Sequence, residues 1–425
     1  MADRVIFHVD ANSAFLSWSA AYRCKVLGEE TDLRDVPSVV AGDKESRHSI
    51  ILAKSTPAKK YGIHTGEPLF QAQEKCPELK VVEPDYGLYV EASRHFVEML
   101  RQFSPNVEQY SIDEAWVDMT GTQRIFGDPR LAAEQMRCRI WEELGFTVNV
   151  GISSNKILAK MAGDFEKPNK VHTLFPEEIE EKFWPLPVRD LFWVGSVTEQ
   201  KLKKMGIYTI GDLAKTEEKV LKKRLGKHGQ TIWHYANGRN AELVTPEPAE
   251  NKGYGNSVTT AKDVTDREDG YQVLLSLCET VAMRMRKDGK SGSCVAVYLR
   301  TNEFHSFSHQ MLLHGATNIT EELFRAACRA FDEVWDGRIP LRQLGVQVTR
   351  LATEPYQQFD LFSGITPAKY ERKLRLDETV DQLRDKFGED IIRRAKFAQD
   401  PEHHMAGGLS KARRTGVTKP VPKEF

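Results

Sequence analysis

The 425-residue sequence contains no apolar run that approaches the roughly 18 residues needed for a membrane-spanning helix. The first residues, Met1-Ala2-Asp3-Arg4, lead directly into the strand-like Val5-Ile6-Phe7 and lack the pattern of a signal peptide. Secretion and a membrane partner are therefore not expected, and the predicted location is the cytoplasm.

Closely spaced cysteines are also missing. No pair has the spacing of a zinc knuckle, and a chain of this length does not need disulfide bonds to fold. The six cysteines lie far apart, at Cys24, Cys76, Cys138, Cys278, Cys294 and Cys328. This distribution predicts free thiols in a reducing compartment.

The chain has no overall excess of positive charge, because 60 Lys and Arg residues face 61 Asp and Glu residues. A strongly basic domain is the usual sign of nucleic-acid binding, so any such function must depend on local charge. Between Lys201 and Gln230, nine basic residues face only three acidic ones. This segment is the candidate for a basic surface.

The first 165 residues alternate strand-like and helix-like patterns and predict a mixed α/β domain. The predicted strands are Arg4–Val9, Ser38–Gly42, Ser49–Ala53, Lys80–Glu83, Val107–Ile112, Ala115–Met119 and Thr147–Ile152. The predicted helices are Ser13–Val26, Leu88–Phe103, Leu131–Leu144 and Asn155–Gly163. A Gly-, Pro- and Lys-rich piece, about residues 28 to 80, is inserted between these strands.

The remainder of the chain predicts a helical segment over 168–240 and a breaker-rich linker from Thr245 through Gly253 and Gly255. Two helices and four strands follow, the strands over Ser257–Thr260, Ser293–Arg300, Ser306–Leu313 and Leu344–Leu351. The last 70 residues carry an apolar patch at Phe359–Phe362 and a helix near Leu376–Phe387, and they end in a polar stretch.

Three acidic residues stand where predicted strands end or turn: Asp10, Asp113 and Glu114. Acids are depleted in strand interiors, and converging carboxylates need a cation such as Mg²⁺ to stay ionised together. A two-metal site of this kind supports phosphoryl transfer. Strand neighbours point to opposite faces, so Asp113 and Glu114 can share a site only at a turn or bulge. The alternative is a tight hairpin that the acidic pair merely decorates.

Two stretches, FHVDANSAFLSWSA (7–20) and YSIDEAWVDMTG (110–121), resemble bacterial Y-family translesion DNA polymerases of the polymerase IV type and the polymerase V catalytic-subunit type. The resemblance continues through ILAKSTPAKKYGIHTGEPLF (51–70), DYGLYVEASRHF (85–96) and VGISSNKILAKMAGDFEKPNK (150–170), and more loosely to about residue 400.

This resemblance implies a multidomain α/β and α+β fold, the right-hand polymerase architecture. The implied domains are a palm (1–27 and 80–166), fingers (28–79), a helical thumb with a helix-hairpin-helix (167–243), a linker (244–252), an α+β little finger (253–352) and a tail (353–425). It also implies that Asp10, Asp113 and Glu114, with the carbonyl of Ala11, bind two Mg²⁺ ions. The implied substrates are primer-template DNA and dNTP.

Four residues match nucleotide-binding positions of the family. Phe15 matches the steric gate that rejects ribonucleotides, although the ring could instead belong to the core. Lys167, before Pro168, matches the triphosphate-binding lysine, with a solvated surface lysine as the alternative. Thr56 and Lys59 depart from the polymerase IV pattern, which usually has tyrosine and arginine at these positions, and the stretch is closer to the polymerase V catalytic type. A lysine neutralises a phosphate but lacks the bidentate fork of arginine.

In the thumb, Trp193-Val194-Gly195 and the glycine in Met205-Gly206-Ile207 resemble a helix-hairpin-helix, with Trp193 in the place of its first glycine. The resemblance implies that Gly195, Gly206 and Lys227 contact DNA phosphates without reading sequence. A solvated helix face is the alternative.

A short apolar peptide in the tail resembles the motif that binds the bacterial sliding clamp. Its residues are Gln358, Phe359, Asp360, Leu361 and Phe362. An apolar run in a polar tail either docks on a partner or packs into the core, and both interpretations remain open.

The predicted function is that of a monomeric, template-directed, low-fidelity DNA polymerase without proofreading that performs translesion synthesis while bound to the clamp. Two alternatives compete with it. One is a non-catalytic accessory protein that binds DNA and the clamp, which only the departures at Thr56 and Lys59 support. The other is a palm-fold nucleotidyl cyclase, which would need neither a clamp peptide nor a sugar gate.

Overall fold

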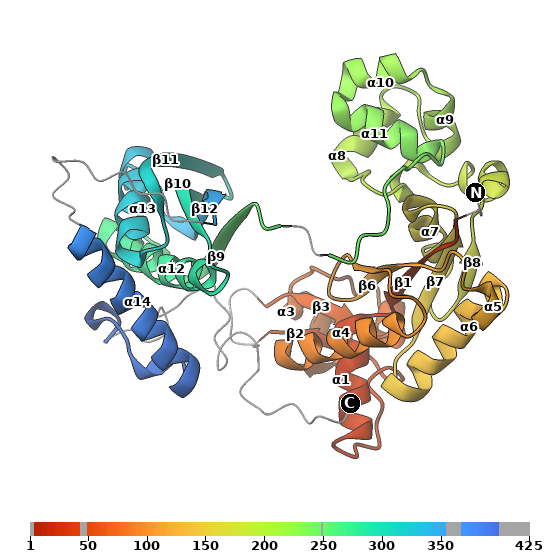
Figure 1. The fold of residues 1–425 in the computed structure, drawn as a ribbon, viewed down its shortest axis with the longest axis horizontal. Helices are drawn as coiled ribbons and strands as arrows, with labels where there is room; N and C mark the ends of the chain where they lie inside the picture. Colours follow the sequence, from red (N-terminus) through yellow and green to blue (C-terminus); the bar gives the residue numbers. More distant parts are fainter. Residues whose placement is uncertain (1–3, 43–48, 248–249, 354–366, 399–425) are drawn as a thin grey trace. The chain divides into compact units, whose positions relative to one another are not determined.

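The structure is a computed structural model that describes residues 4–42, 49–247, 250–353 and 367–398. The described residues up to 247 form one compact unit and those from 250 onward form a second (Figure 1). Among these residues, no helix is both long enough and apolar enough to cross a membrane.

A five-stranded sheet with the order β5-β6-β1-β7-β8 lies at the centre of the first unit. Strand β1 pairs antiparallel with both β6 and β7, whereas β8 pairs parallel with β7. The strands are β1 (Ile6–Ala11), β5 (Val107–Gln109), β6 (Glu114–Asp118), β7 (Val148–Ser153) and β8 (Val171–Thr173). Strand β8 comes from the segment assigned to the thumb, 167–243, and it extends this sheet instead.

The two faces of β1 meet different parts of the chain because side chains alternate along a strand. Phe7 and Val9 join a large core with three helices, whereas Ile6 packs near α7 (Lys156–Gly163). The three helices are α1 (Ala14–Lys25), α4 (Tyr86–Arg101) and α6 (Pro129–Arg139). Helix α6 continues into a π-helical turn, Ile140–Leu144, and the short α5 (Gln123–Phe126) precedes it.

A second, three-stranded sheet has the order β3-β2-β4 and its own small core. Its elements are β2 (Ser38–Ala41), β3 (Ile51–Lys54), α2 (Thr56–Lys60), α3 (Leu69–Lys75) and β4 (Lys80–Val82). Strand β4, assigned to the palm from the sequence, pairs parallel with β2 and belongs to this sheet instead. The side chain of Ser55 caps α2 by accepting the Ala58 N–H.

Four helices that share one core form the thumb segment, drawn in green in Figure 1. They are α8 (Ser196–Lys203), α9 (Ile210–Lys215), α10 (Glu218–Leu225) and α11 (Lys227–Ala236). Thr209 and Asp212 form a capping box that fixes the start of α9.

The second unit is an antiparallel sheet, β11-β10-β12-β9, that shares one core with two helices. The elements are β9 (Gly253–Val264), α12 (Arg267–Lys287), β10 (Ser291–Thr301), β11 (Ser306–Thr317), α13 (Thr320–Val334) and β12 (Leu341–Ala352). Gly255, which the breaker-rich pattern placed in the linker, lies inside β9 and pairs with Gln347.

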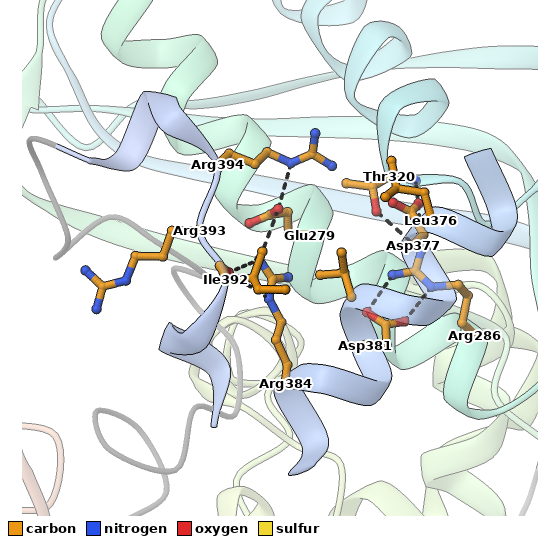
Figure 2. Close-up of a pocket in the computed structure, with 11 residues that line it drawn as sticks. Glu279, Arg286, Thr320, Leu376, Asp377, Asp381, Arg384, Ile392, Arg393 and Arg394 are labelled. Atoms are coloured by element: carbon orange, nitrogen blue, oxygen red, sulfur yellow. Dashed lines mark hydrogen bonds and ion pairs between the residues drawn. The ribbon is translucent and has the colours of Figure 1, made fainter. Parts of the chain in front are cut away.

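Helix α14 (Pro367–Phe387) begins nine residues before the predicted Leu376 and is held against α12 by buried ion pairs (Figure 2). Arg286 on α12 binds Asp381 at 2.6 Å and Asp377 at 3.2 Å. Glu279, also on α12, accepts a hydrogen bond from Arg394 at 2.7 Å. The predicted clamp peptide, 358–362, lies outside the described residues.

Candidate active site

A tight turn between β5 and β6 carries the acidic pair. Strand β5 ends at Gln109 rather than at the predicted Ile112, and the N–H of Tyr110 donates to the carbonyl of Glu114 at 3.0 Å. Asp113 therefore lies in the turn, whereas Glu114 is the first residue of β6. Because Asp113 is not in a strand, strand alternation does not force the two side chains apart.

Asp10 faces Glu114 across the sheet. Strand β1 runs through Ala11, so Asp10 lies inside the strand rather than after the predicted end at Val9. Asp10 and Glu114 are direct cross-strand partners, which puts both side chains on the same face. The N–H of Ala11 donates to the carbonyl of Asp113 at 2.9 Å, which fixes the turn beside the end of β1.

Cationic side chains pair with two of these acids. Lys167 pairs with Asp10 and also with Asp164, the latter at 2.8 Å. Glu114 pairs with Lys160 and lies 2.9 Å from Nε2 of His8. In the part of the chain that the structure describes, no three His, Cys, Asp or Glu side chains are grouped as a metal site.

The environment shifts the pKa values of this cluster in different directions. Burial raises the pKa of Asp10, against the opposing effect of Lys167. Burial also acts to raise the pKa of Glu114, but hydrogen bonds from His8 and Lys160 outweigh it and lower the pKa to about 2. Burial lowers the pKa of His8. Glu114 is therefore a carboxylate at neutral pH, held by partners on β1 and α7.

The oxygen donors around Asp10 fit a hard divalent cation. Asp10, Ala11 and Asp113 line one cavity of about 370 Å³. Carboxylate and backbone carbonyl oxygens are the ligands that Mg²⁺ takes in proteins. The hydroxyl of Ser111 donates to Asp113 Oδ1 at 2.6 Å and orients that carboxylate.

Phe15 lines the same cavity, together with Lys59. Its ring stacks on Tyr89 with centroids 4.4 Å apart and an interplanar angle of 6°. The ring of Tyr86 packs edge-on against Phe15, with ring centroids 6.1 Å apart. Phe15 thus packs against the core and borders the cavity, and its position is fixed by neighbouring rings.

A neighbouring cavity of about 180 Å³ brings together the other predicted nucleotide-binding residues. Thr56, Lys59 and Lys167 all line it, and it shares Asp10 with the first cavity. Arg34, which the sequence analysis did not single out, also lines it. The guanidinium of Arg34 binds Asp32 at 2.6 Å and the carbonyl of Gly145 at 2.6 Å.

Lys160 and His8 are functional candidates that sequence reasoning missed. A signal was present, because Lys156 and Lys160 recur four residues apart in an otherwise apolar helix. Buried lysines need acidic partners, and Lys156 indeed binds Glu108 at 2.6 Å. His8 gave no such signal in the sequence, because its contact with Glu114 arises only from the register of β1 against β6.

The predicted DNA-binding residues lie at or beside the ends of the thumb helices, and none of them lines either cavity. Gly195 is the N-cap of α8, and Gly206, with a φ of +79°, follows that helix. Lys227 is exposed at the start of α11. Trp193 has a φ of +74°, a backbone conformation that glycine adopts readily and other residues rarely do.

Comparison with protein families identifies most of the chain. Residues 9–164 match the impB/mucB/samB family and residues 251–361 match the C-terminal domain of that family. Residues 189–240 match the thumb domain described for DNA polymerase-iota.

Individual relatives extend the similarity over nearly the full chain. A DNA polymerase IV of Clostridium acetobutylicum is 43% identical, over 94% of this chain and 99% of the relative. A DNA polymerase IV of Acetivibrio thermocellus is 37% identical, over 93% of this chain and 98% of the relative. The fold is similar to that of a Y-family DNA polymerase chimera, Dbh-Dpo4(243-245)-Dbh, with a TM-score of 0.71 and 22% identity over 82% of this chain and 100% of that one.

Proposed function

The chain belongs to the impB/mucB/samB family of Y-family polymerases and is a DNA-directed DNA polymerase of the translesion class, and from this premise we propose that it works by two-metal nucleotidyl transfer. One observation supports the proposal most directly. Asp10 and Glu114 face each other across the sheet, and Asp113 lines a cavity with Asp10 and Phe15.

Asp10, Asp113 and Glu114, with the carbonyl of Ala11, would hold two Mg²⁺ ions. When bound, such ions activate the primer 3′-hydroxyl and stabilise the pyrophosphate leaving group. Lys160 and His8 position Glu114 for this task, because both bind its carboxylate from buried sites.

The side chains of the two cavities would hold the incoming nucleotide. Lys59 and Lys167 supply positive charge for the triphosphate, and Thr56 supplies a hydroxyl. Phe15 would pack against the sugar and leave no room for a 2′-hydroxyl. The substrates are thus a primer-template DNA and a dNTP.

Three further features belong to the proposal. The enzyme acts as a monomer, and it docks on the sliding clamp through Gln358, Phe359, Asp360, Leu361 and Phe362. It also lacks proofreading: in this sequence the matched segments leave 1–8, 165–188, 241–250 and 362–425, each shorter than a typical domain of about 100 residues.

Primer extension with Mg²⁺, on an undamaged template and on one with an abasic site, tests the function. The purified chain should extend both, and Asp113→Ala should reduce extension below about 1% while primer-template binding is retained. Glu98→Ala, which removes an exposed carboxylate on α4, is the matched control and should extend normally.

Residual synthesis by Asp113→Ala well above that level would contradict the assigned role of this carboxylate. A wild-type chain that binds primer-template but does not extend it, even with Mg²⁺, would favour the non-catalytic accessory protein instead.

A further inference from the structure

Trp193 combines an unfavourable backbone with an exposed ring. Its φ of +74° lies in the left-handed region, which is unfavourable for a bulky residue. Its side chain is nevertheless 56% exposed, so burial of the ring does not offset this strain. A glycine would adopt the same backbone without penalty. Strain that folding does not explain is typical of residues with a binding role.

The ring of Trp193 is held in place by a second aromatic side chain. His228, in the first turn of α11, stacks on it with centroids 6.3 Å apart and an interplanar angle of 20°. The Nε2 atom of His228 lies 3.5 Å from the hydroxyl of Thr198 on α8. The aromatic pair therefore bridges the start of α8 and the start of α11.

Exposed cations occupy the same helices. Lys227 is the direct neighbour of His228, and Lys201, Lys203 and Lys204 are exposed on or just after α8. These side chains belong to the segment with nine basic and three acidic residues. Charge of this kind attracts the phosphates of nucleic acid, and an aromatic face among such charges fits the apolar part of a nucleotide.

We propose that Trp193 and His228 form an aromatic contact for a deoxyribose of duplex DNA on the thumb. This inference rests on the proposed function and on the DNA contacts that the family resemblance implies for Gly195, Gly206 and Lys227 of the thumb. Within a duplex the base faces are stacked on one another, so the sugar is the apolar surface that remains accessible to the ring. The indole would thereby replace the backbone contact that a glycine at this position allows, while the lysines bind the adjacent phosphates.

Trp193→Gly separates this role from a structural one. Because glycine relieves the backbone strain, the variant should unfold at the same temperature as wild type or a higher one. Its dissociation constant for a primer-template duplex should rise about tenfold, as expected for loss of an aromatic stack on a nucleotide. Trp193→Phe, which keeps a ring, should recover most of the affinity, and His228→Ala should weaken binding without changing the strained backbone.

The salt dependence of binding distinguishes the ring from the charges. For Trp193→Gly the slope of log K against log salt should equal that of wild type, because no phosphate contact is lost. For Lys227→Ala the slope should fall by about one. On a duplex with abasic sites opposite the thumb, the dissociation constants of wild type and Trp193→Gly should differ by the same factor as on intact DNA, because the sugars remain.

Three results would overturn the inference. The first is wild-type affinity in Trp193→Gly, and the second is a lower unfolding temperature in that variant. The third is equal dissociation constants of wild type and Trp193→Gly on abasic DNA. The last would mean that the ring contacts a base. Primer extension by wild type, lost in Asp113→Ala, reports on the proposed function independently. If extension is normal while Trp193→Gly binds like wild type, only the thumb contact is wrong.

Discussion

At the residue scale, the proposed selection of the sugar depends on where one ring is held. Phe15 borders the cavity beside Asp10, and its stack on the fully buried Tyr89 leaves little freedom to move aside. A fixed ring discriminates by steric exclusion, and its removal opens space for a 2′-hydroxyl.

Phe15→Ala should therefore admit ribonucleotides. The ratio of kcat/KM for a dNTP to that for the matching rNTP should fall by roughly 10–200-fold, the range for a single pocket contact. Tyr89→Phe keeps the stack and loses only the hydrogen bond to Ser19, so it should leave the ratio near that of wild type. Unchanged discrimination in Phe15→Ala would show that the ring is not the gate.

Single residues also show what sequence can predict about the site. Asp10, Asp113 and Glu114 were singled out as candidate metal ligands because carboxylates next to apolar strand segments are unusual and because these residues matched family motifs. Lys160 and His8 were missed, because their contacts with Glu114 depend on strand register and on the packing of α7 over β1. Arg34 was missed because only the tertiary fold brings it beside Thr56 and Lys167.

At the element scale, most strands and the helices α1, α4, α6 and α7 lie within a few residues of their predicted bounds, and the differences have physical reasons. The strand expected over Val107–Ile112 stops at Gln109, because the N–H groups of Tyr110 and Ser111 bond the carbonyl of Glu114 in a turn. Strand β4 pairs parallel with β2, a non-local pairing that leaves no local pattern in the sequence. In the same way, β8 joins β7 across the predicted thumb boundary.

Helix α14 depends on an ion pair with α12, and loss of one partner should loosen it. Arg286 and Asp381 are both largely buried and make two hydrogen bonds, so Asp381→Ala leaves a buried guanidinium with one partner fewer. Removal of one member of such a pair typically costs about 3–5 kcal/mol. Hydrogen exchange in the full chain should show amides of α14 opening far more readily than in wild type.

An exposed pair on the same helix provides the control. Glu371 and Arg375 lie 3.5 Å apart, and most of each side chain is in solvent. Arg375→Ala should therefore change the free energy of opening of the α14 amides, measured by hydrogen exchange, by less than about 1 kcal/mol. Equal effects of the two substitutions would mean that the buried pair in Figure 2 does not hold the helix.

At the scale of the whole molecule, the net charge of the chain conceals a local excess of basic residues. A net charge of −1 argued against nucleic-acid binding, yet the thumb segment carries a local excess of basic residues, exposed on its helices. The two compact units divide between residues 247 and 250, within the segment 244–252 where the sequence analysis placed a linker. Breaker residues are a local signal of a division in the chain. The strand pairings that complete each sheet join distant segments, so they can be seen only in the folded structure.

The predicted clamp peptide connects two elements of one unit. Strand β12 ends at Ala352 and α14 begins at Pro367, and both belong to the second unit, so residues 358–362 are joined to it at both ends. Helix α14 is held against α12 of the same unit by the ion pair between Arg286 and Asp381. A docking peptide between two anchored elements would tether the polymerase to the clamp through that unit.

Phe359→Ala combined with Leu361→Ala should therefore abolish the stimulation of processivity by the clamp. Each buried apolar anchor of a short docking peptide is expected to contribute about 2 kcal/mol or more, so clamp affinity should fall by well over 100-fold. Extension measured without the clamp should be retained, and Arg375→Ala should be stimulated like wild type. A uniform loss of extension, with and without the clamp, would instead assign these residues to the core, since packing defects act on both reactions equally.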